Sequence, residues 1–303
     1  MIEGLAKMDV LYRISPEVLL HACASQSPGP HKKPLLVFLH YWGGSSSTWH
    51  KLTSRDSPIS LSSVYPTLAV DLRGWGQSEG PKCEDGSSYS ISAMASDIAM
   101  LLEHLKTRPE TGEYFAHGFV FVGHSMGAKV ALGTLPLLPA QLRHELRGLV
   151  LVAPAPPGTL DLPPEMKEQQ KVAYASEESI YWTVTNVLAK PENLGEKDID
   201  LVVRDSLVGN QLAKRAWPTY GMREDLSESV KKSFSSIGNT IRARIIVGEL
   251  DVIEPRERVE AGVCDFLKEC GLQVTLDVAP GVKHLVPLEC PEIIHEVISS
   301  LDD

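Results

Sequence analysis

The sequence predicts an α/β fold, in which a mostly parallel sheet is covered by helices on both faces. Short, continuous apolar runs rich in β-branched residues recur along the chain, as expected of strands buried on both faces. Segments with apolar residues at helical spacing lie between them, which is typical of strand–helix–strand units. The 303 residues are 43% hydrophobic and 22% charged, which suits one large globular domain or a domain with an insertion.

The N-terminal half contains five predicted strands and a long helix. Residues 10–14 and 18–24 alternate imperfectly between polar and apolar, as an antiparallel pair at a sheet edge does. Continuous buried strands are predicted at residues 35–40, 67–72 and 118–122. One face of an amphipathic helix is formed by Ile91, Met94, Ile98, Leu101, Leu102 and Leu105.

The rest of the chain repeats this alternation. Further buried strands are predicted at residues 148–152, 243–247 and 274–278. One helix between the last two is expected to end before Gly271, a typical C-cap residue. The final helix follows Pro291 and carries an apolar face of Ile293, Ile294, Val297, Ile298 and Leu301.

The alternation fails between about residues 154 and 241. This stretch has two proline pairs, clustered aromatic residues and helix-like pieces, but no run that resembles a buried strand. We expect residues 154–241 to form a helical cap, or lid, inserted into a core formed by residues 1–153 and 242–303. The alternative is a second, unrelated domain.

The chain is organised around the sequence Gly123-His124-Ser125-Met126-Gly127. A buried strand precedes it, and residues 128–135 are predicted to be helical. Strand, Gly-x-Ser-x-Gly and helix together form a nucleophile elbow, where a sharp, strained turn exposes the serine hydroxyl. The following helix points its N-terminal N–H groups at the same place. We therefore predict that Ser125 is a nucleophile.

A serine hydroxyl needs a base, and the base needs an orienting acid. Asp251 follows the predicted strand 243–247, and His284 follows the strand 274–278. Loops at the carboxyl ends of parallel strands meet at one edge of the sheet, so His284 is the predicted base and Asp251 the predicted acid. Glu249 and Glu254 are alternative acids. Asp71 is expected to brace a turn.

The other histidines are weaker candidates for the base. We expect the His124 side chain to leave the elbow in another direction, and His40 to organise the loop that follows it. Seven more lie in edge, loop or helical contexts without a predicted catalytic role: His21, His31, His50, His104, His117, His144 and His295.

The oxyanion of a tetrahedral intermediate needs two N–H donors. We predict the backbone N–H of Met126 and that of Trp42, in the loop His40-Tyr41-Trp42-Gly43-Gly44. Aromatic residues of the cap are candidates to line the substrate pocket. The main candidates are Trp182 and Trp217, and Tyr181 and Tyr220 are further candidates. Tyr41 is the substrate-binding candidate on the opposite wall.

Taken together, the chain resembles the α/β-hydrolase superfamily. The resemblance rests on the His-x-x-Gly-Gly loop, Asp71-Leu72-Arg73-Gly74-Trp75-Gly76-Gln77-Ser78, the elbow, Gly-Glu-Leu-Asp and the late His284. It implies an eight-stranded sheet with a cap after the sixth strand. Two departures stand out: Tyr41 occupies a position where the family usually has Gly, and Ala128 follows the elbow where Gly is common. A serine nucleophile speaks against dehalogenases and epoxide hydrolases, which attack with a carboxylate.

The resemblance and the residues point to a serine hydrolase that cleaves an ester or lactone of a small to medium, partly apolar molecule. The same triad could cleave a C–C bond in a β-diketone, and the scaffold could host a lyase or cyclase step. A small-molecule receptor that retains the triad is an alternative from another class. No organic cofactor or metal is implied.

Charge and cysteine usage limit the partners. The formal net charge is −10 and the pI about 5.5, which argues against nucleic acid or an anionic membrane as partner. The five cysteines include no Cys-x-x-Cys pair, so a disulfide framework or zinc site is not expected. Neither a signal peptide nor a membrane-spanning run is visible. We expect a cytoplasmic monomer or homodimer.

Overall fold

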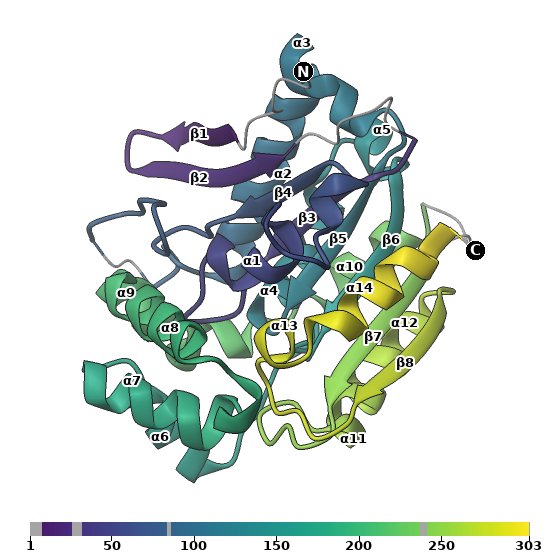
Figure 1. Cartoon of the computed structure of the whole chain (residues 1–303). Coiled ribbons are helices and arrows are strands. Elements are labelled where there is room, and N and C mark those ends of the chain that lie inside the picture. The colour runs from purple at the N-terminus through teal and green to yellow at the C-terminus, as the bar shows by residue number, and fades with distance from the viewer. Residues whose placement is uncertain (1–7, 26–31, 84–85, 237–240, 303) are drawn as a thin grey trace.

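The computed structural model describes residues 8–25, 32–83, 86–236 and 241–302 (Figure 1). One eight-stranded sheet crosses the molecule in the order β1-β2-β4-β3-β5-β6-β7-β8. β1 pairs with β2 and β2 pairs with β4 in antiparallel fashion, and the other neighbours are parallel. This confirms the predicted α/β class, the antiparallel edge and the eight strands. The strands are β1 (Met8–Ser15), β2 (Val18–Ser25), β3 (Leu35–Leu39), β4 (Thr67–Val70), β5 (Phe119–His124), β6 (Leu146–Val152), β7 (Arg242–Gly248) and β8 (Gln273–Ala279).

Helices follow most strands. The α-helices are α1 (His50–Thr53), α2 (Ile91–Thr107), α3 (Pro109–Gly112), α4 (Met126–Thr134), α5 (Ala140–Arg143), α6 (Pro164–Val172), α7 (Glu177–Thr183), α8 (Glu196–Val208), α9 (Gln211–Thr219), α10 (Ser227–Phe234), α11 (Arg256–Val259), α12 (Asp265–Glu269), α13 (Val286–Glu289) and α14 (Pro291–Ser299). Two π-helical segments are η5 (Val184–Leu188) and η8 (Glu260–Cys264). Short 3-10 turns are η1 (Ser46–Trp49), η2 (Leu61–Ser63), η3 (Glu113–Phe115), η4 (Leu135–Leu137), η6 (Pro191–Asn193), η7 (Gly221–Arg223) and η9 (Ser300–Asp302).

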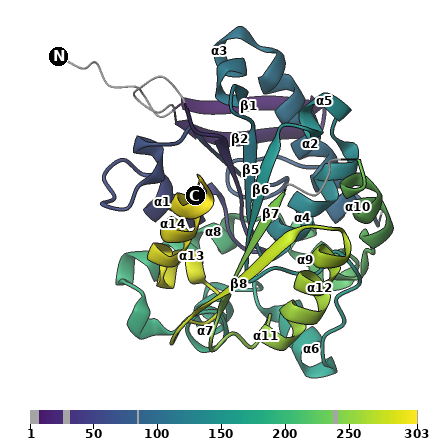
Figure 2. The ribbon, with the colours of Figure 1, turned by 90° about the vertical axis from the view of Figure 1, so that its right-hand side faces the viewer.

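The strand β3 shows how the core is divided. All five of its residues are buried, but alternate side chains point to opposite faces of the sheet. Leu35, Val37 and Leu39 belong to the core cluster beneath α2 and α4, whereas Leu36 and Phe38 belong to the cluster beneath α1 and α14. Figure 2 shows α1 and α14 on one side of the sheet and α2 and α4 on the other. Burial on both faces explains the uninterrupted apolar run.

The described residues between β6 and β7 form helices and no strand. In Figure 1, α6, α7, α8 and α9 lie together beyond one end of the sheet, with α7 against α8 and α6 against α9. α10 instead packs against α4 of the sheet layer. Within the described ranges, no helix combines the length and the apolar character needed to cross a membrane.

Candidate active site

Ser125 lies between the end of β5 and the start of α4, in strained backbone. Its φ of 54° and ψ of −115° are unusual for a residue with a side chain. The flanking glycines make the turn possible: a Cβ on Gly127 would lie 2.3 Å from the carbonyl oxygen of Leu39, and one on Gly123 would lie 2.6 Å from the Cα of Ala128. The sequence motif therefore folds as the expected elbow.

His284 and Asp251 form a buried pair beside this turn. The two atoms His284 Nδ1 and Asp251 Oδ2 are 2.7 Å apart, and the side chains are 3% and 0% exposed. Asp251 Oδ1 also accepts the backbone N–H groups of Ile253 at 2.8 Å and Glu254 at 3.0 Å. With the proton on Nδ1 donated to Asp251, the lone pair on Nε2 is free to accept a proton.

Ser125 and His284 line one cavity. The described contacts include no hydrogen bond between the Ser125 hydroxyl and His284, and bonds of this kind often tighten only when substrate is bound. The arrangement nevertheless brings the predicted nucleophile, base and acid together from three separate loops.

The two alternative acids do not contact His284. Glu249 is exposed, and its carboxylate accepts the N–H of Gly281 at 2.7 Å. Glu254 is 1% exposed, and neither of its carboxyl oxygens has a hydrogen-bond partner. Burial, followed by the nearby Asp251 charge, raises the pKa of Glu254 well above its usual value.

His124 has a role that sequence reasoning missed. The His124 ring points away from the elbow, as expected. Its Nε2 donates a hydrogen bond to the carbonyl oxygen of His284 at 2.9 Å. Burial, followed by the neighbouring His284, lowers the pKa of His124 well below its usual value, so the ring is neutral. Its ring packs against Tyr41, with 5.0 Å between centroids. The position beside Ser125 was visible in the sequence, but the partner 160 residues away was not.

The loop after β3 is held by internal hydrogen bonds. His40 Nε2 accepts the N–H of Leu72 at 3.0 Å, so Nδ1 carries the proton and donates to the carbonyl oxygen of Tyr41 at 2.7 Å. Burial lowers the pKa of His40, which keeps the ring neutral. His40 therefore organises this loop, as the sequence suggested. Asp71 likewise braces turns, since its carboxylate accepts the N–H groups of Ser46 and Gln77 at 2.6 and 2.8 Å.

Trp42 is clamped by residues from the helical segment between β6 and β7. The Trp42 indole Nε1 donates to the carbonyl oxygen of Lys214 at 3.1 Å, and the Tyr174 hydroxyl donates to the carbonyl oxygen of Trp42 at 2.7 Å. The Trp42 backbone N–H has no hydrogen-bond acceptor among the described residues. The N–H of Met126 is the first of α4 and lacks an intrahelical acceptor. Both predicted oxyanion donors are thus unengaged.

The cavity at Ser125 is small and largely apolar. Its volume is about 40 Å³, against the 300–1,000 Å³ that is roughly typical of ligand pockets. Two of the predicted substrate-binding residues, Tyr41 and Trp217, line it, and so does Trp42, which was predicted as an oxyanion donor. The remaining lining residues beyond Ser125 and His284 are Gln169, Gln170, Ala173, Tyr174, Thr183, Val187, Leu188 and Ile253.

Trp182 lies elsewhere, and the expectation that it lines the pocket is corrected. In α7, Ile180 and Thr183 are buried, so the helical period turns Trp182 to the opposite side. Its side chain is 52% exposed and is not among the residues that line the cavity. Clustering of aromatic residues in the sequence did not distinguish the two faces of this helix.

The segment between β6 and β7 also contacts the loop that carries His284 and the helix α4. The carbonyl oxygen of Leu188, in η5, accepts the N–H groups of His284 at 2.9 Å and Leu285 at 3.0 Å. Lys129, on α4, is buried and donates through Nζ to the carbonyl oxygens of Gly158 at 2.8 Å and Met222 at 3.2 Å. Burial lowers the pKa of Lys129 to about 8. Nothing in the sequence pattern predicted that this lysine is internal.

Comparison with solved structures shows the fold. A bromoperoxidase from Bacillus anthracis has a TM-score of 0.75 at 16% identity, over 98% of this chain and 100% of the other. An esterase from Exiguobacterium antarcticum has a TM-score of 0.74 at 19% identity, with the same coverage.

A sequence relative and a family model complete the comparison. Epoxide hydrolase 4 of Mus musculus is 29% identical over 106 residues, which are 34% of this chain and 24% of that protein. The chain thus spans about a quarter of this relative's length. The model of the alpha/beta hydrolase family matches residues 36–297. Since this match covers most of the chain and the sheet, elbow and late histidine are all present, the protein belongs to the alpha/beta hydrolase family.

Proposed function

We propose that this protein is a serine hydrolase that cleaves an ester or lactone through an acyl-enzyme. One observation carries the proposal: His284 Nδ1 is 2.7 Å from Asp251 Oδ2, and His284 shares a buried cavity with Ser125 on its strained turn. This is the arrangement in which a base is held in the correct tautomer to activate a hydroxyl. The serine nucleophile favours this reaction over epoxide opening by a carboxylate.

The reaction would proceed in two balanced halves. Ser125 Oγ attacks the substrate carbonyl carbon while His284 Nε2 takes the hydroxyl proton, and the N–H groups of Met126 and Trp42 stabilise the oxyanion. The C–O bond then breaks, and His284 returns the proton to the departing alcohol oxygen. Water attacks the acyl-enzyme with His284 again as base, which releases the acid and restores Ser125. Every proton is carried by a group of this chain.

We also propose that residues 154–241 act as a cap over this site. Tyr174, Leu188 and Trp217 from this segment form part of the cavity wall. A cavity of about 40 Å³ holds only about three waters at roughly 10–15 Å³ each, so the cap must shift to admit a small to medium substrate. Closure would then exclude water from the first half-reaction.

Covalent labelling tests the proposed chemistry. A fluorophosphonate probe should modify Ser125, as read by peptide mapping. Ser125→Ala should lose labelling and reduce turnover of an aryl ester by about 10⁴-fold or more. Ser229→Ala removes an exposed hydroxyl on α10 and serves as the matched control, with both signals unchanged.

The same protein should be assayed on aryl esters, lactones and β-diketones. Multiple turnover of an ester or lactone would support the proposal. Turnover that persists in Ser125→Ala would overturn it. Labelling without turnover on any substrate would instead favour a receptor that retains the triad.

A further inference from the structure

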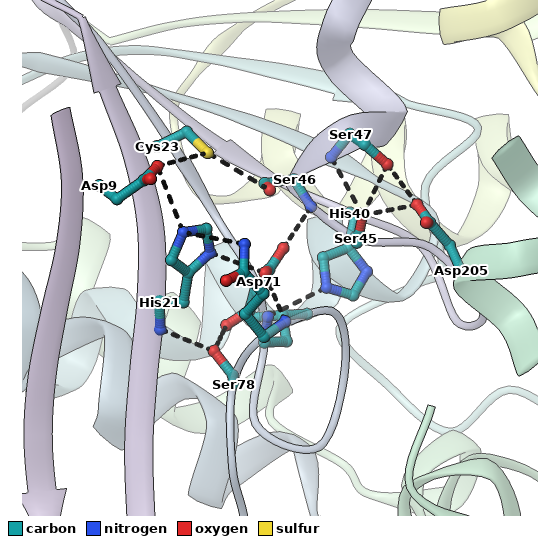
Figure 3. Close-up of polar contacts among 12 residues, drawn as sticks. Asp9, His21, Cys23, His40, Ser45, Ser46, Ser47, Asp71, Ser78 and Asp205 are labelled. Carbon is teal, nitrogen blue, oxygen red and sulfur yellow. Dashed lines mark hydrogen bonds and ion pairs between the residues drawn. The ribbon is translucent and has the colours of Figure 1, made fainter. Parts of the chain in front are cut away.

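A second group of chemically active side chains lies on the β1–β2 hairpin. Asp9 on β1 is directly opposite Cys23 on β2, and His21 is two residues before Cys23. Side chains two apart on a strand share a face, so all three project to the same side (Figure 3). The cluster unites an oxygen, a nitrogen and a sulfur ligand, the donor types that bind zinc.

The spacing of these three atoms suits a single tetrahedral ion. His21 Nε2 and Asp9 Oδ1 are 3.5 Å apart, and Asp9 Oδ1 and Cys23 Sγ are 3.7 Å apart. All three atoms lie within 4.8 Å of one another. A tetrahedral zinc ion with bonds of about 2.0 Å to N, about 2.1 Å to O and about 2.3 Å to S separates N from O by about 3.4 Å and O from S by about 3.6 Å. The N–O and O–S separations are therefore within about 0.1 Å of those of a zinc site, and His21 Nε2 lies within 4.8 Å of Cys23 Sγ.

His21 is oriented for this task by a buried carboxylate. Its Nδ1 is 2.8 Å from Asp71 Oδ2, and both side chains are 2% exposed. When Nδ1 donates to Asp71, the lone pair of Nε2 points toward Asp9 and Cys23. Metal-binding histidines are usually fixed by such a carboxylate on the other ring nitrogen. The amide of Gln77 lies 3.4 Å from Nε2, close enough for its oxygen to complete the coordination after a rotation.

The cluster is accessible from solvent. Cys23, Asp71 and Gln77 line a cavity of about 740 Å³, separate from the one at Ser125. The Asp9 side chain is 67% exposed. An ion can therefore approach Asp9 and Cys23 from solvent, and a water molecule can fill a fourth position.

We propose that Asp9, His21 and Cys23 bind a zinc ion, with water or the Gln77 amide oxygen as fourth ligand. The ion would cross-link β1 to β2. Through His21 and Asp71 it would also brace the loops that carry Ser46 and Gln77. The role is structural, and Ser125 chemistry does not depend on it. Without a metal, the same contacts are an ion pair of a protonated His21 with two carboxylates, and this is the competing explanation to be tested.

The test measures metal binding on the full chain after chelator treatment. Zinc affinity is obtained by competition with a chromophoric chelator, and cobalt(II) reports a thiolate ligand through its sulfur-to-metal absorption band. The wild type should bind one zinc and show the band. Cys23→Ser should lose the absorption band. Both Cys23→Ser and Asp9→Asn should weaken zinc binding by about 10- to 100-fold or more, because even the loss of an outer-shell partner of a metal ligand lowers metal affinity by that factor. Cys270→Ser, a half-buried cysteine on another element, is the matched control and should match the wild type.

Asp9 is exposed, so its variant should fold normally, and circular dichroism of each variant checks this. Zinc should raise the melting temperature of the wild type and of Cys270→Ser, but not of Cys23→Ser. Equal affinity in wild type, Cys23→Ser and Asp9→Asn, or no thiolate band in the wild type, would overturn the proposal. Fluorophosphonate labelling of Ser125 should persist in the chelator-treated protein, so the outcome is independent of the proposed hydrolase function.

Discussion

Replacing Asp251 and Glu254 separately would test which carboxyl group supports catalysis. The two lie three residues apart, and both are buried. Asp251 accepts hydrogen bonds from His284 Nδ1, which lies 2.7 Å from Oδ2, and from two backbone N–H groups. Glu254 accepts no hydrogen bond through its side chain. In Asp251→Asn, one oxygen can keep the two backbone contacts, but the new amide nitrogen faces His284. The histidine proton then moves to Nε2, which can no longer take the Ser125 proton.

The expected loss follows from that tautomer change. Asp251→Asn should reduce kcat by about 10³- to 10⁴-fold, or about 4 to 5.5 kcal/mol at 1.36 kcal/mol per tenfold. Glu254 makes no hydrogen bond to His284, so Glu254→Gln should leave kcat nearly unchanged. The assay is kcat and KM on an activated aryl ester, with thermal unfolding of each variant as the folding control. A loss of rate in Glu254→Gln equal to that in Asp251→Asn would refute the assignment of the acid.

Glu254 has a separate effect on stability. Its folded-state pKa lies well above the 4.5 of an ordinary glutamate, so above pH 4.5 the folded protein binds a proton that the unfolded chain releases. The stability of the wild type should therefore fall, relative to Glu254→Gln, as the pH rises from 4.5 toward the folded-state pKa. The slope is at most about 1.4 kcal/mol per pH unit for one proton. Urea unfolding of both proteins at several pH values measures this slope, and parallel curves would contradict a raised pKa of Glu254.

Two further variants test the cavity and the internal lysine. Trp217→Ala should raise the ratio of kcat/KM for bulky over small esters, whereas Trp182→Ala, on the exposed side of α7, should leave it unchanged. A ratio equal to that of the wild type in both variants would place neither residue at the pocket. The depressed pKa of Lys129, about 8 against 10.5, means that the unfolded chain binds more protons between these values. The stability of the wild type relative to Lys129→Met should therefore increase from pH 8 to pH 10.5, by up to about 3 kcal/mol in urea unfolding. A constant difference would show that the folded-state pKa is normal.

The sequence by itself determined the order of strands and helices along the chain and the backbone geometry of the elbow. Strands buried on both faces must be continuously apolar, and a turn as tight as that at Ser125 needs glycines where a Cβ would collide with backbone. Because these requirements act on neighbouring residues, they can be recognised in short consecutive stretches of the sequence. The order of Ser125, Asp251 and His284 was readable for the same reason, because each follows a recognisable strand.

Tertiary structure alone decided which distant groups meet. The sequence favoured Asp251 over Glu254 as the acid, but only the folded loop places the Asp251 carboxylate on His284 and leaves the buried Glu254 carboxyl group without a hydrogen-bond partner. The exposure of Trp182 depends on which side of α7 faces the molecule. Asp9, His21 and Cys23 are brought together by strand register, and Asp71, fifty residues from His21, orients the histidine. Register and packing are set by the whole core, and no pattern of neighbouring residues encodes them.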